Sequence, residues 1–215
     1  MINYWQMTNF QFTMESLTLL LSGVEEFTSN LILKEVPPHI VYHDLLHTQE
    51  VVEAVCEIGL QCGLDTESMD ILQISAWFHD TGHCKTALGH EEISAIIAEN
   101  YLKDLDRNLF DKIRGCILAT KMPQNPQNLL QQVICDADLF SLGTPNFYDR
   151  SMLLKKEWEF LGNTKFSDIE FCEQNIRFLQ QHQYFTPYGK TILTKGKEQN
   201  ILSEQARLKK MKSKC

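Results

Sequence analysis

Apolar residues recur along most of this chain at the spacing of an α-helix. The segment Thr48–Cys62 places apolar side chains at i, i+4, i+7 and i+11, on Val51, Val55, Ile58 and Cys62. Residues at these intervals line one face of a helix, because a helix completes a turn about every 3.6 residues. The segment is therefore predicted to be a helix with one face in a core.

The segment Thr66–Asp80 is apolar on most sides near its end, which is typical of a buried helix at the centre of a bundle. Comparable patterns predict seven further helices, separated by breaks that are often marked by proline. These helices are Met14–Leu33, His90–Leu102, Arg107–Ala119, Gln127–Leu142, Phe147–Leu161, Ser167–His182 and Lys197–Lys212. Sustained alternation with a period of two is absent. The chain is therefore predicted to be all-α, a single-domain bundle of about eight or nine helices covering residues 1–215.

The composition indicates a globular chain without a membrane span. Hydrophobic residues make up 43% of the 215 residues, enough for one sizeable core. No window approaches eighteen uncharged apolar residues, and the N-terminal segment lacks the basic region of a signal peptide. We therefore expect a cytoplasmic protein that does not insert into a membrane.

Charge and cysteine content restrict the function further. The formal net charge of −8 argues against binding duplex nucleic acid, which requires clustered Lys and Arg. A bound metal ion would still allow a small anionic substrate. The seven cysteines include no C-x-x-C pair, which indicates reduced thiols rather than a disulfide scaffold. The lysines near the C-terminus are interpreted as a solvated helix end; they are Lys209, Lys210, Lys212 and Lys214.

Six of the seven histidines, at positions 39, 43, 47, 79, 83 and 90, fall in the first 90 residues. His43 and His47 are four residues apart, as are His79 and His83, and this spacing predicts that each pair shares one face of a helix. His47 also continues the apolar stripe of Thr48–Cys62, so its side chain is predicted to point into the interior.

The dipeptide His79-Asp80 ends the most hydrophobic predicted helix. Burying an ionised Asp there costs several kcal/mol unless a partner neutralises it. A helix cap over Thr81-Gly82, or a pair between His79 and Asp80, would explain the dipeptide alone. A divalent metal ion would explain the dipeptide and the neighbouring histidine groups together, because mixed imidazole and carboxylate ligation suits zinc, manganese, iron or nickel.

A second buried acid is expected in the stretch ICDADLFSLG, which contains Asp136 and Asp138. Apolar residues precede and follow both, so a helix cap explains neither well. Helical spacing does not choose between the two, although Asp136 lies nearer the mean apolar direction.

Taken in order, these residues resemble the HD superfamily of metal-dependent phosphohydrolases, whose signature is a His, a His-Asp pair ending a buried helix, and a distant Asp. The resemblance covers about residues 35–145, followed by C-terminal helices over 146–215, and implies an HD-type helical bundle. It also implies that a metal ion is held by His47, His79, Asp80 and Asp138. Asp138 is chosen over Asp136 because its Ala-Asp-Leu context approximates that of the last ligand in the family. Gly89-His90-Glu91-Glu92 resembles an element that helps to hold a second metal, and a polar helix N-terminus is an equally good explanation of His90.

Two shorter elements resemble class I cyclic-nucleotide phosphodiesterases. The run Tyr42–His47 is similar to their Y-H-N-x-x-H element, with Asp44 in place of Asn, and the run His79–His83 is similar to H-D-x-x-H. This resemblance implies catalytic roles for His43, as general acid, and for His83. The Gln that clamps the purine in those enzymes has no identifiable counterpart in the sequence. The HD-GYP group differs, because it has Lys in place of His83 and a G-Y-P element.

The function expected from these observations is hydrolysis of a nucleotide phosphate ester by metal-activated water, with a cyclic or other phosphodiester as the first choice of substrate. One or two divalent ions are implied, from among Mn, Fe, Ni, Zn, Mg and Co. HD-type nucleotidases and ppGpp hydrolases share the four ligands, and a non-catalytic module that senses nucleotides is the alternative from another class.

Four aromatic side chains are predicted to pack in the core rather than to line a base pocket; they are Phe140, Phe147, Tyr148 and Trp158. Lys85 is predicted to lie in a solvated loop.

Overall fold

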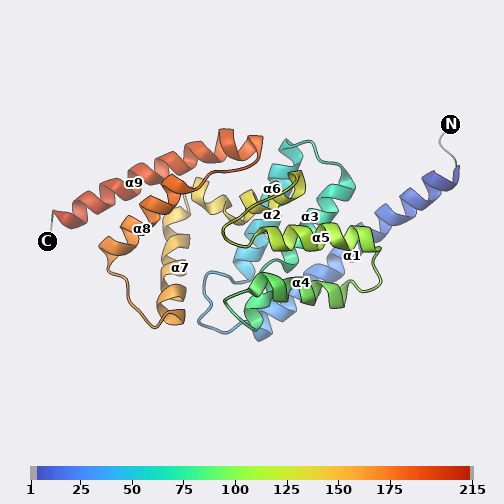
Figure 1. Cartoon of the computed structure of the whole chain (residues 1–215), viewed down its shortest axis with the longest axis horizontal. Helices are drawn as coiled ribbons and strands as arrows, with labels where there is room; N and C mark the ends of the chain where they lie inside the picture. Colours follow the sequence, from blue (N-terminus) through green and yellow to red (C-terminus); the bar gives the residue numbers. More distant parts are fainter. Residues whose placement is uncertain (1–3, 214–215) are drawn as a thin grey trace.

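The computed structural model describes residues 4–213, with side chains described for residue 17 and for residues 19–213. Within this range the chain forms nine α-helices and no β-strand, which confirms the all-α prediction (Figure 1). The helices are α1 (Tyr4–Glu35), α2 (Leu45–Gln61), α3 (Thr66–Phe78), α4 (His90–Tyr101), α5 (Arg107–Ala119), α6 (Leu129–Asp138), α7 (Phe147–Leu161), α8 (Asp168–Gln181) and α9 (Thr194–Lys212). Two 3-10 helices, η1 (Thr81–Cys84) and η2 (Phe140–Gly143), and a π-helical turn, η3 (Gly189–Leu193), lie between them.

Side-chain caps set several helix starts. Asp65 accepts a hydrogen bond from the Ser68 N–H at the start of α3, and Asn128 accepts one from Gln131 at the start of α6. The predicted helix over 127–142 is therefore shorter at both ends, because Asn128 caps its start and the chain leaves the helix after Asp138.

Helix α3 lies at the centre of the N-terminal part of the bundle, as its apolar pattern predicts. It packs against α1, α2, α5 and α6. From Ile71 to Phe78 all of its side chains except Gln73 are buried. Val51, Val55 and Ile58 of α2 are buried as well, as the stripe in the sequence predicts.

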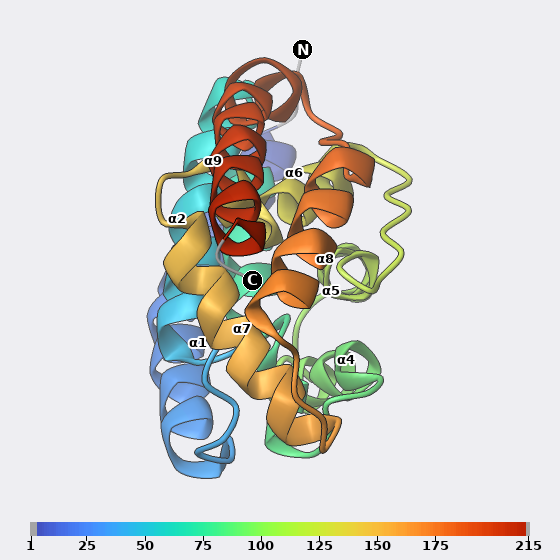
Figure 2. The same cartoon turned by 90° about the vertical axis from the view of Figure 1, so that its left-hand side faces the viewer.

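Helices α7, α8 and α9 follow the last of these elements and lie together on one side of the molecule (Figure 2). Helix α9 packs along α8 and contacts η2 and η3. The candidate site lies where this C-terminal group faces the ends of α2, α3 and α6. No helix in residues 4–213 is long and apolar enough to cross a membrane.

Candidate metal and catalytic site

His47 lies in the first turn of α2, and its side chain is buried with 3% exposure. Asp44 is the N-cap of this helix and accepts a hydrogen bond from the His47 N–H at 2.9 Å. His43 therefore precedes the helix, and the prediction that His43 and His47 share a helical face is wrong. Their rings are nevertheless close, with centroids 5.7 Å apart.

His79 and Asp80 lie at the C-terminal end of α3, which ends one residue earlier, at Phe78. His83 belongs to the 3-10 helix η1, so His79 and His83 do not share a helical face either. The close packing of η1 against the start of α4 requires glycine at position 82, because a Cβ there would lie 2.0 Å from the carbonyl oxygen of His90. The turn brings the residues that follow α3 against the start of α4.

The two acids of α6 face different parts of the molecule. Asp138 is the last residue of the helix and points toward His47 and His79. Asp136 is fully buried and accepts hydrogen bonds from the N–H groups of Phe185 and Thr186 and from the Thr186 hydroxyl. Asp136 therefore fastens the segment between α8 and η3, while Asp138 lies at the histidine cluster.

Four side chains converge from the ends of α2, α3 and α6. The Nε2 atom of His47 lies 3.4 Å from Asp80 Oδ2 and 3.3 Å from Asp138 Oδ1. The Nε2 atom of His79 lies 3.2 Å and 3.7 Å from the same two oxygens. Ligand atoms on a tetrahedral ion with bonds of about 2.0–2.2 Å are about 3.3–3.6 Å apart. The spacing observed here therefore fits ligands around a common divalent ion.

Hydrogen bonding supports the same interpretation. Although these atoms are buried, His47 Nε2, His79 Nε2 and Asp80 Oδ2 have no hydrogen-bond partner among the described residues. The other ring nitrogen of His79, Nδ1, donates to the Ala76 carbonyl at 2.7 Å. This bond leaves the lone pair of Nε2 facing the carboxylates, which is the arrangement of a metal-ligating imidazole.

The electrostatics of the cluster are those of opposite charges held close together. Burial lowers the pKa of His79, but Asp80 and Asp138 outweigh it and raise that pKa well above its usual value. Burial raises the pKa of Asp138, but the imidazoles of His47 and His79 beside it outweigh burial, so that the pKa falls to about 2. A divalent cation bound at this point would replace imidazole protons, so metal binding is expected to release protons.

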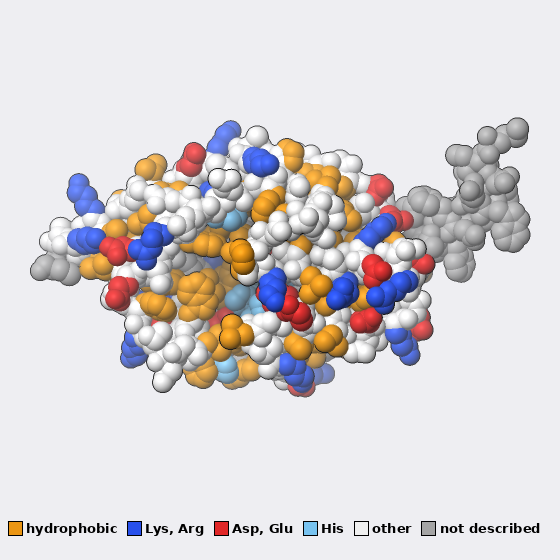
Figure 3. Space-filling view, in the orientation of Figure 1, with side chains coloured by type: hydrophobic (Ala, Val, Ile, Leu, Met, Phe, Trp, Pro, Cys, Tyr) orange, Lys and Arg blue, Asp and Glu red, His pale blue; other side chains and the backbone are white. Residues whose placement is uncertain are grey.

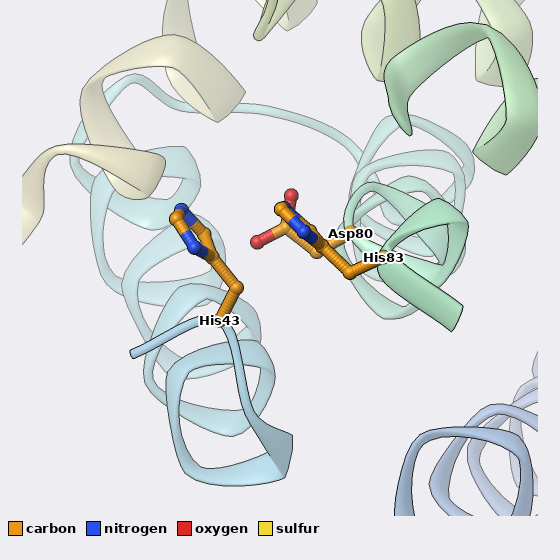
Figure 4. Close-up of side chains that lie close together, drawn as sticks. All are labelled: His43, Asp80 and His83. Carbon is orange, nitrogen blue, oxygen red and sulfur yellow. The ribbon is translucent and has the colours of Figure 1, made fainter. Parts of the chain in front are cut away.

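A second group of side chains lies on the other oxygen of Asp80. His90 Nε2 is 3.2 Å from Asp80 Oδ1, while His90 Nδ1 donates to the Ala87 carbonyl at 3.0 Å. His43, Asp80 and His83 also offer three ligand atoms within 4.8 Å of one another. Figure 4 shows the His43 ring on one side of a gap and the His83 ring with the Asp80 carboxylate on the other side.

The rings of His43, His83 and His90 form a stack. Their centroids are 4.4 Å apart for His43 and His83, and 3.9 Å apart for His83 and His90. Neither ring nitrogen of His83 has a hydrogen-bond partner among the described residues. Burial lowers the pKa of His83 to about 3, so this ring is neutral and both a metal ion and a bound water are suitable partners for it.

Glu157 of α7 is a site residue that sequence reasoning missed. Its carboxylate is 1% exposed and lies 2.5 Å from Nδ1 of His43. Asp44 is the acidic neighbour of His43 in the sequence, but its side chain caps α2 instead. Because 114 residues separate His43 from Glu157, no local spacing indicates the contact. A buried acid within a helix was the only available signal.

A cavity of about 510 Å³ opens above these residues. Its floor includes Tyr42, His43, Asp80, His90 and Asp138. Its walls are largely apolar and come from η2, α7 and α8, through Leu142, Phe147, Leu154, Trp158 and Phe178. Figure 3 shows histidine side chains within a hollow that hydrophobic side chains surround.

Some of the aromatic residues were therefore assigned wrongly. Trp158 is 44% exposed and lines the cavity, so core packing does not describe it, whereas Phe147 is buried in the core, as predicted, and also lines the cavity. Tyr148 lies outside the cavity, with the Arg207 guanidinium over its ring. Lys85 is exposed, which agrees with a solvated loop.

Two polar residues of α8, Gln174 and Asn175, also line the cavity and were not singled out from the sequence. The side-chain oxygen of Gln174 is buried without a hydrogen-bond partner among the described residues. An amide oxygen in this state is available to a ligand, because leaving it unpaired is costly.

The comparison with family models agrees with this geometry. Residues 44–143 match the family described as HD domain. The matched segment runs from the cap of α2 to the end of η2 and includes His47, His79, Asp80, His90 and Asp138. Neither the curated proteins nor the solved structures gave a match to this chain. Residues 44–143 of this protein therefore contain an HD domain, which supports the resemblance to the HD superfamily of metal-dependent phosphohydrolases.

Proposed function

We propose that the protein hydrolyses a phosphodiester of nucleotide type, with His47, His79, Asp80 and Asp138 holding one metal ion. His90, together with Asp80 and His83, is proposed to hold a second. The observation that carries the proposal is the convergence of unpaired His and Asp atoms at the floor of a largely apolar cavity. When bound, a divalent cation supplies a Lewis acid for a phosphoryl oxygen and lowers the pKa of the attacking water.

His43 is proposed as the general acid for the leaving group. Its Nδ1–H donates to the Glu157 carboxylate, which fixes the ring and directs Nε2 away from that contact. His43 also lines the cavity, so its second nitrogen can meet the leaving oxygen of a substrate bound there. An alkoxide leaves poorly unless it is protonated as the bond breaks, and a positioned His typically contributes about 10²–10⁴-fold in rate.

The charge of the cavity favours a diester over a polyphosphate. Arg150 is the only Arg or Lys among the described residues that line it, and Glu91 adds an acid beside the metal ligands. A diester carries one negative charge, whereas a nucleotide with several phosphates needs several cations to neutralise it. A ppGpp-type substrate is therefore the less suitable one.

The walls of the cavity favour an aromatic group such as a nucleobase. Trp158 and Phe178 offer aromatic faces beside the unpaired amide oxygen of Gln174. Gln side chains present both a donor and an acceptor, the combination that the edge of a base requires. Gln174 is thus our candidate for the base-reading residue that the sequence did not reveal.

A hydrolysis screen tests the proposal. Purified protein is supplied with Mn²⁺, Fe²⁺, Ni²⁺, Zn²⁺, Mg²⁺ or Co²⁺ and assayed on bis-(p-nitrophenyl) phosphate and p-nitrophenyl phosphate, then on cyclic and linear nucleotides. We expect the diester to be cleaved faster than the monoester. Preference for the monoester would replace the diesterase by a nucleotidase, and nucleotide binding without turnover under every metal would leave a sensing module.

A further inference from the structure

Arg150 of α7 is a buried cation that the proposed chemistry does not use. Its side chain is 6% exposed, and it lines the cavity together with Asp80 and Asp138. Burying a guanidinium is costly unless its five N–H groups find acceptors. The partners of Arg150 therefore indicate what the residue is there to bind.

The protein satisfies only part of this guanidinium. Nη2 donates to the Tyr42 carbonyl oxygen at 3.1 Å. Nε lies 3.2 Å from Glu50 Oε2, but without the alignment of a hydrogen bond. Nη1 is buried and has no hydrogen-bond partner among the described residues. At least one pair of N–H groups is therefore left for another acceptor.

The position of Arg150 connects it to the candidate metal site. Its guanidinium carbon lies 4.7 Å from the centroid of the Tyr42 ring. The Tyr42 ring lies 4.8 Å from the ring of His43 and 4.9 Å from that of His47. A single aromatic ring thus separates the guanidinium from the proposed acid and from a proposed ligand.

Charge complementarity indicates an anion as the missing acceptor. The contact to Tyr42 and the loose pair with Glu50 keep Arg150 beside the cavity floor, where it is the only Arg or Lys among the described lining residues. The planar guanidinium matches two oxygens of a phosphate group, and such charge-assisted bonds are about twice as strong as neutral ones.

We propose that Arg150 is a substrate-binding residue that donates hydrogen bonds from its unpaired N–H groups to a non-bridging oxygen of the substrate phosphate. This inference rests on the proposed function, since it places the phosphate of the same substrate in the same cavity. It makes Arg150 a determinant of affinity for the phosphate, distinct from the metal ligands.

Binding of inorganic phosphate tests the assignment, measured by titration calorimetry on full-length protein whose metal content has been determined. Arg150→Met removes the charge and keeps much of the apolar stem. We expect it to weaken phosphate binding about 10- to 100-fold while the metal content stays unchanged. Arg150→Lys keeps the charge without the planar donors, so it should fall between the wild type and Arg150→Met.

Two control variants separate phosphate binding from structural support. Lys155→Met removes another buried cation of α7, one that pairs with Asp168 at 2.7 Å and does not line the cavity. It should leave phosphate binding unchanged. Glu50→Gln removes the acid beside Arg150 and should leave phosphate binding as tight as in the wild type, or tighter.

Several results would overturn the assignment. The first is that the wild type and Arg150→Met bind phosphate equally tightly, and the second is that the wild type binds no phosphate. The third is that Glu50→Gln loses as much phosphate affinity as Arg150→Met. The two proposals fail separately. Diester hydrolysis that survives Arg150→Met with unchanged phosphate affinity refutes the role of Arg150 alone. Phosphate binding that depends on Arg150, in a protein that hydrolyses no ester, refutes the proposed function alone.

Discussion

Nδ1 of His43 lies 2.5 Å from Oε1 of Glu157, which comes from a helix 114 residues further along the chain. The other oxygen of this carboxylate, Oε2, accepts the backbone N–H groups of Tyr42 and His43 at 2.9 and 3.3 Å. Burial raises the pKa of Glu157, but the bonds to His43 outweigh it and the pKa is lowered. An ionised Glu157 therefore fixes both the backbone and the ring at position 43.

Glu157→Gln should consequently impair the same step as His43→Ala. On a diester with an alkoxide leaving group we expect the variant to lose about 10- to 100-fold in kcat, and His43→Ala to lose more. Both variants should lose little kcat on p-nitrophenyl esters, because the leaving group of these esters departs without a proton. Combining the two changes should cost no more than His43→Ala alone, because both act on one group. Steady-state kinetics on both substrates, with metal analysis, check this. Equal losses on both substrates would make the pair structural.

The two acids of α6 provide a matched pair of variants. Asp138→Asn should lose the first metal ion and keep its fold, because it removes a proposed ligand at the cluster. Asp136→Asn should keep the metal and lose about 1–3 kcal/mol of unfolding free energy, since one oxygen that accepts from Thr186 becomes a donor. Elemental analysis and urea denaturation measure the two effects. Retention of metal in Asp138→Asn together with its loss in Asp136→Asn would reverse the assignment.

Metal stoichiometry should distinguish Asp80 from His90. Asp80 lies against His47 and His79 through Oδ2 and against His90 through Oδ1. Asp80→Ala should therefore abolish metal binding and activity, whereas His90→Ala should remove one ion and retain the other. The fold should survive Asp80→Ala, because the cost of burying that charge disappears with it. Mass spectrometry of the metal content gives the number of ions bound by each variant. Unchanged stoichiometry in His90→Ala would show that its contact with Asp80 is only an ion pair.

Recognition of a base should depend on Gln174. Gln174→Leu is expected to raise KM for a nucleotide diester about tenfold, the cost of one or two lost hydrogen bonds. The same change should leave bis-(p-nitrophenyl) phosphate nearly unaffected, because that substrate has no base edge. Gln180→Leu, an exposed position on the same helix, is the control. An equal rise in KM for both substrates would argue against base recognition by Gln174.

Stability should fall in mild acid because of His182, which lies away from the metal cluster at the end of α8. Burial, together with the positive charge of the Lys197 ammonium, which donates to its carbonyl oxygen, lowers the pKa of His182 to about 4. Between about pH 6.5 and pH 4 the unfolded chain binds a proton at this residue that the folded protein does not, so unfolding becomes easier as pH falls.

Allowing for the part of the ring that solvent still reaches, we expect about 2 kcal/mol to be lost across this range through His182. His182→Gln should therefore show a flatter pH dependence than the wild type in urea denaturation at pH 4.5–7.5. Since other groups titrate in both proteins alike, the difference between the two curves isolates His182. Parallel curves would contradict the prediction.

The sequence by itself determined the all-α class and the placement of most helices. Local periodicity suffices for this, because the apolar stripe of a helix such as α2 depends only on residues within a few turns. The same reasoning identified buried polar residues that need a partner. His47 continues that stripe, and His79 and Asp80 end the most apolar helix, so each was visible as a polar group in an apolar setting.

Only the tertiary structure decided which polar groups meet. Helical spacing could not choose between Asp136 and Asp138, because both lie on a helix with neighbours on more than one side. Spacing also misled at His43 and His83, since a helix boundary falls within each pair. Glu157, Arg150 and Gln174 come from helices beyond the matched domain. Their side chains lie at the site only because α7 and α8 pack across it. Contacts between helices that are far apart in the sequence produce no periodic pattern from which they could be predicted.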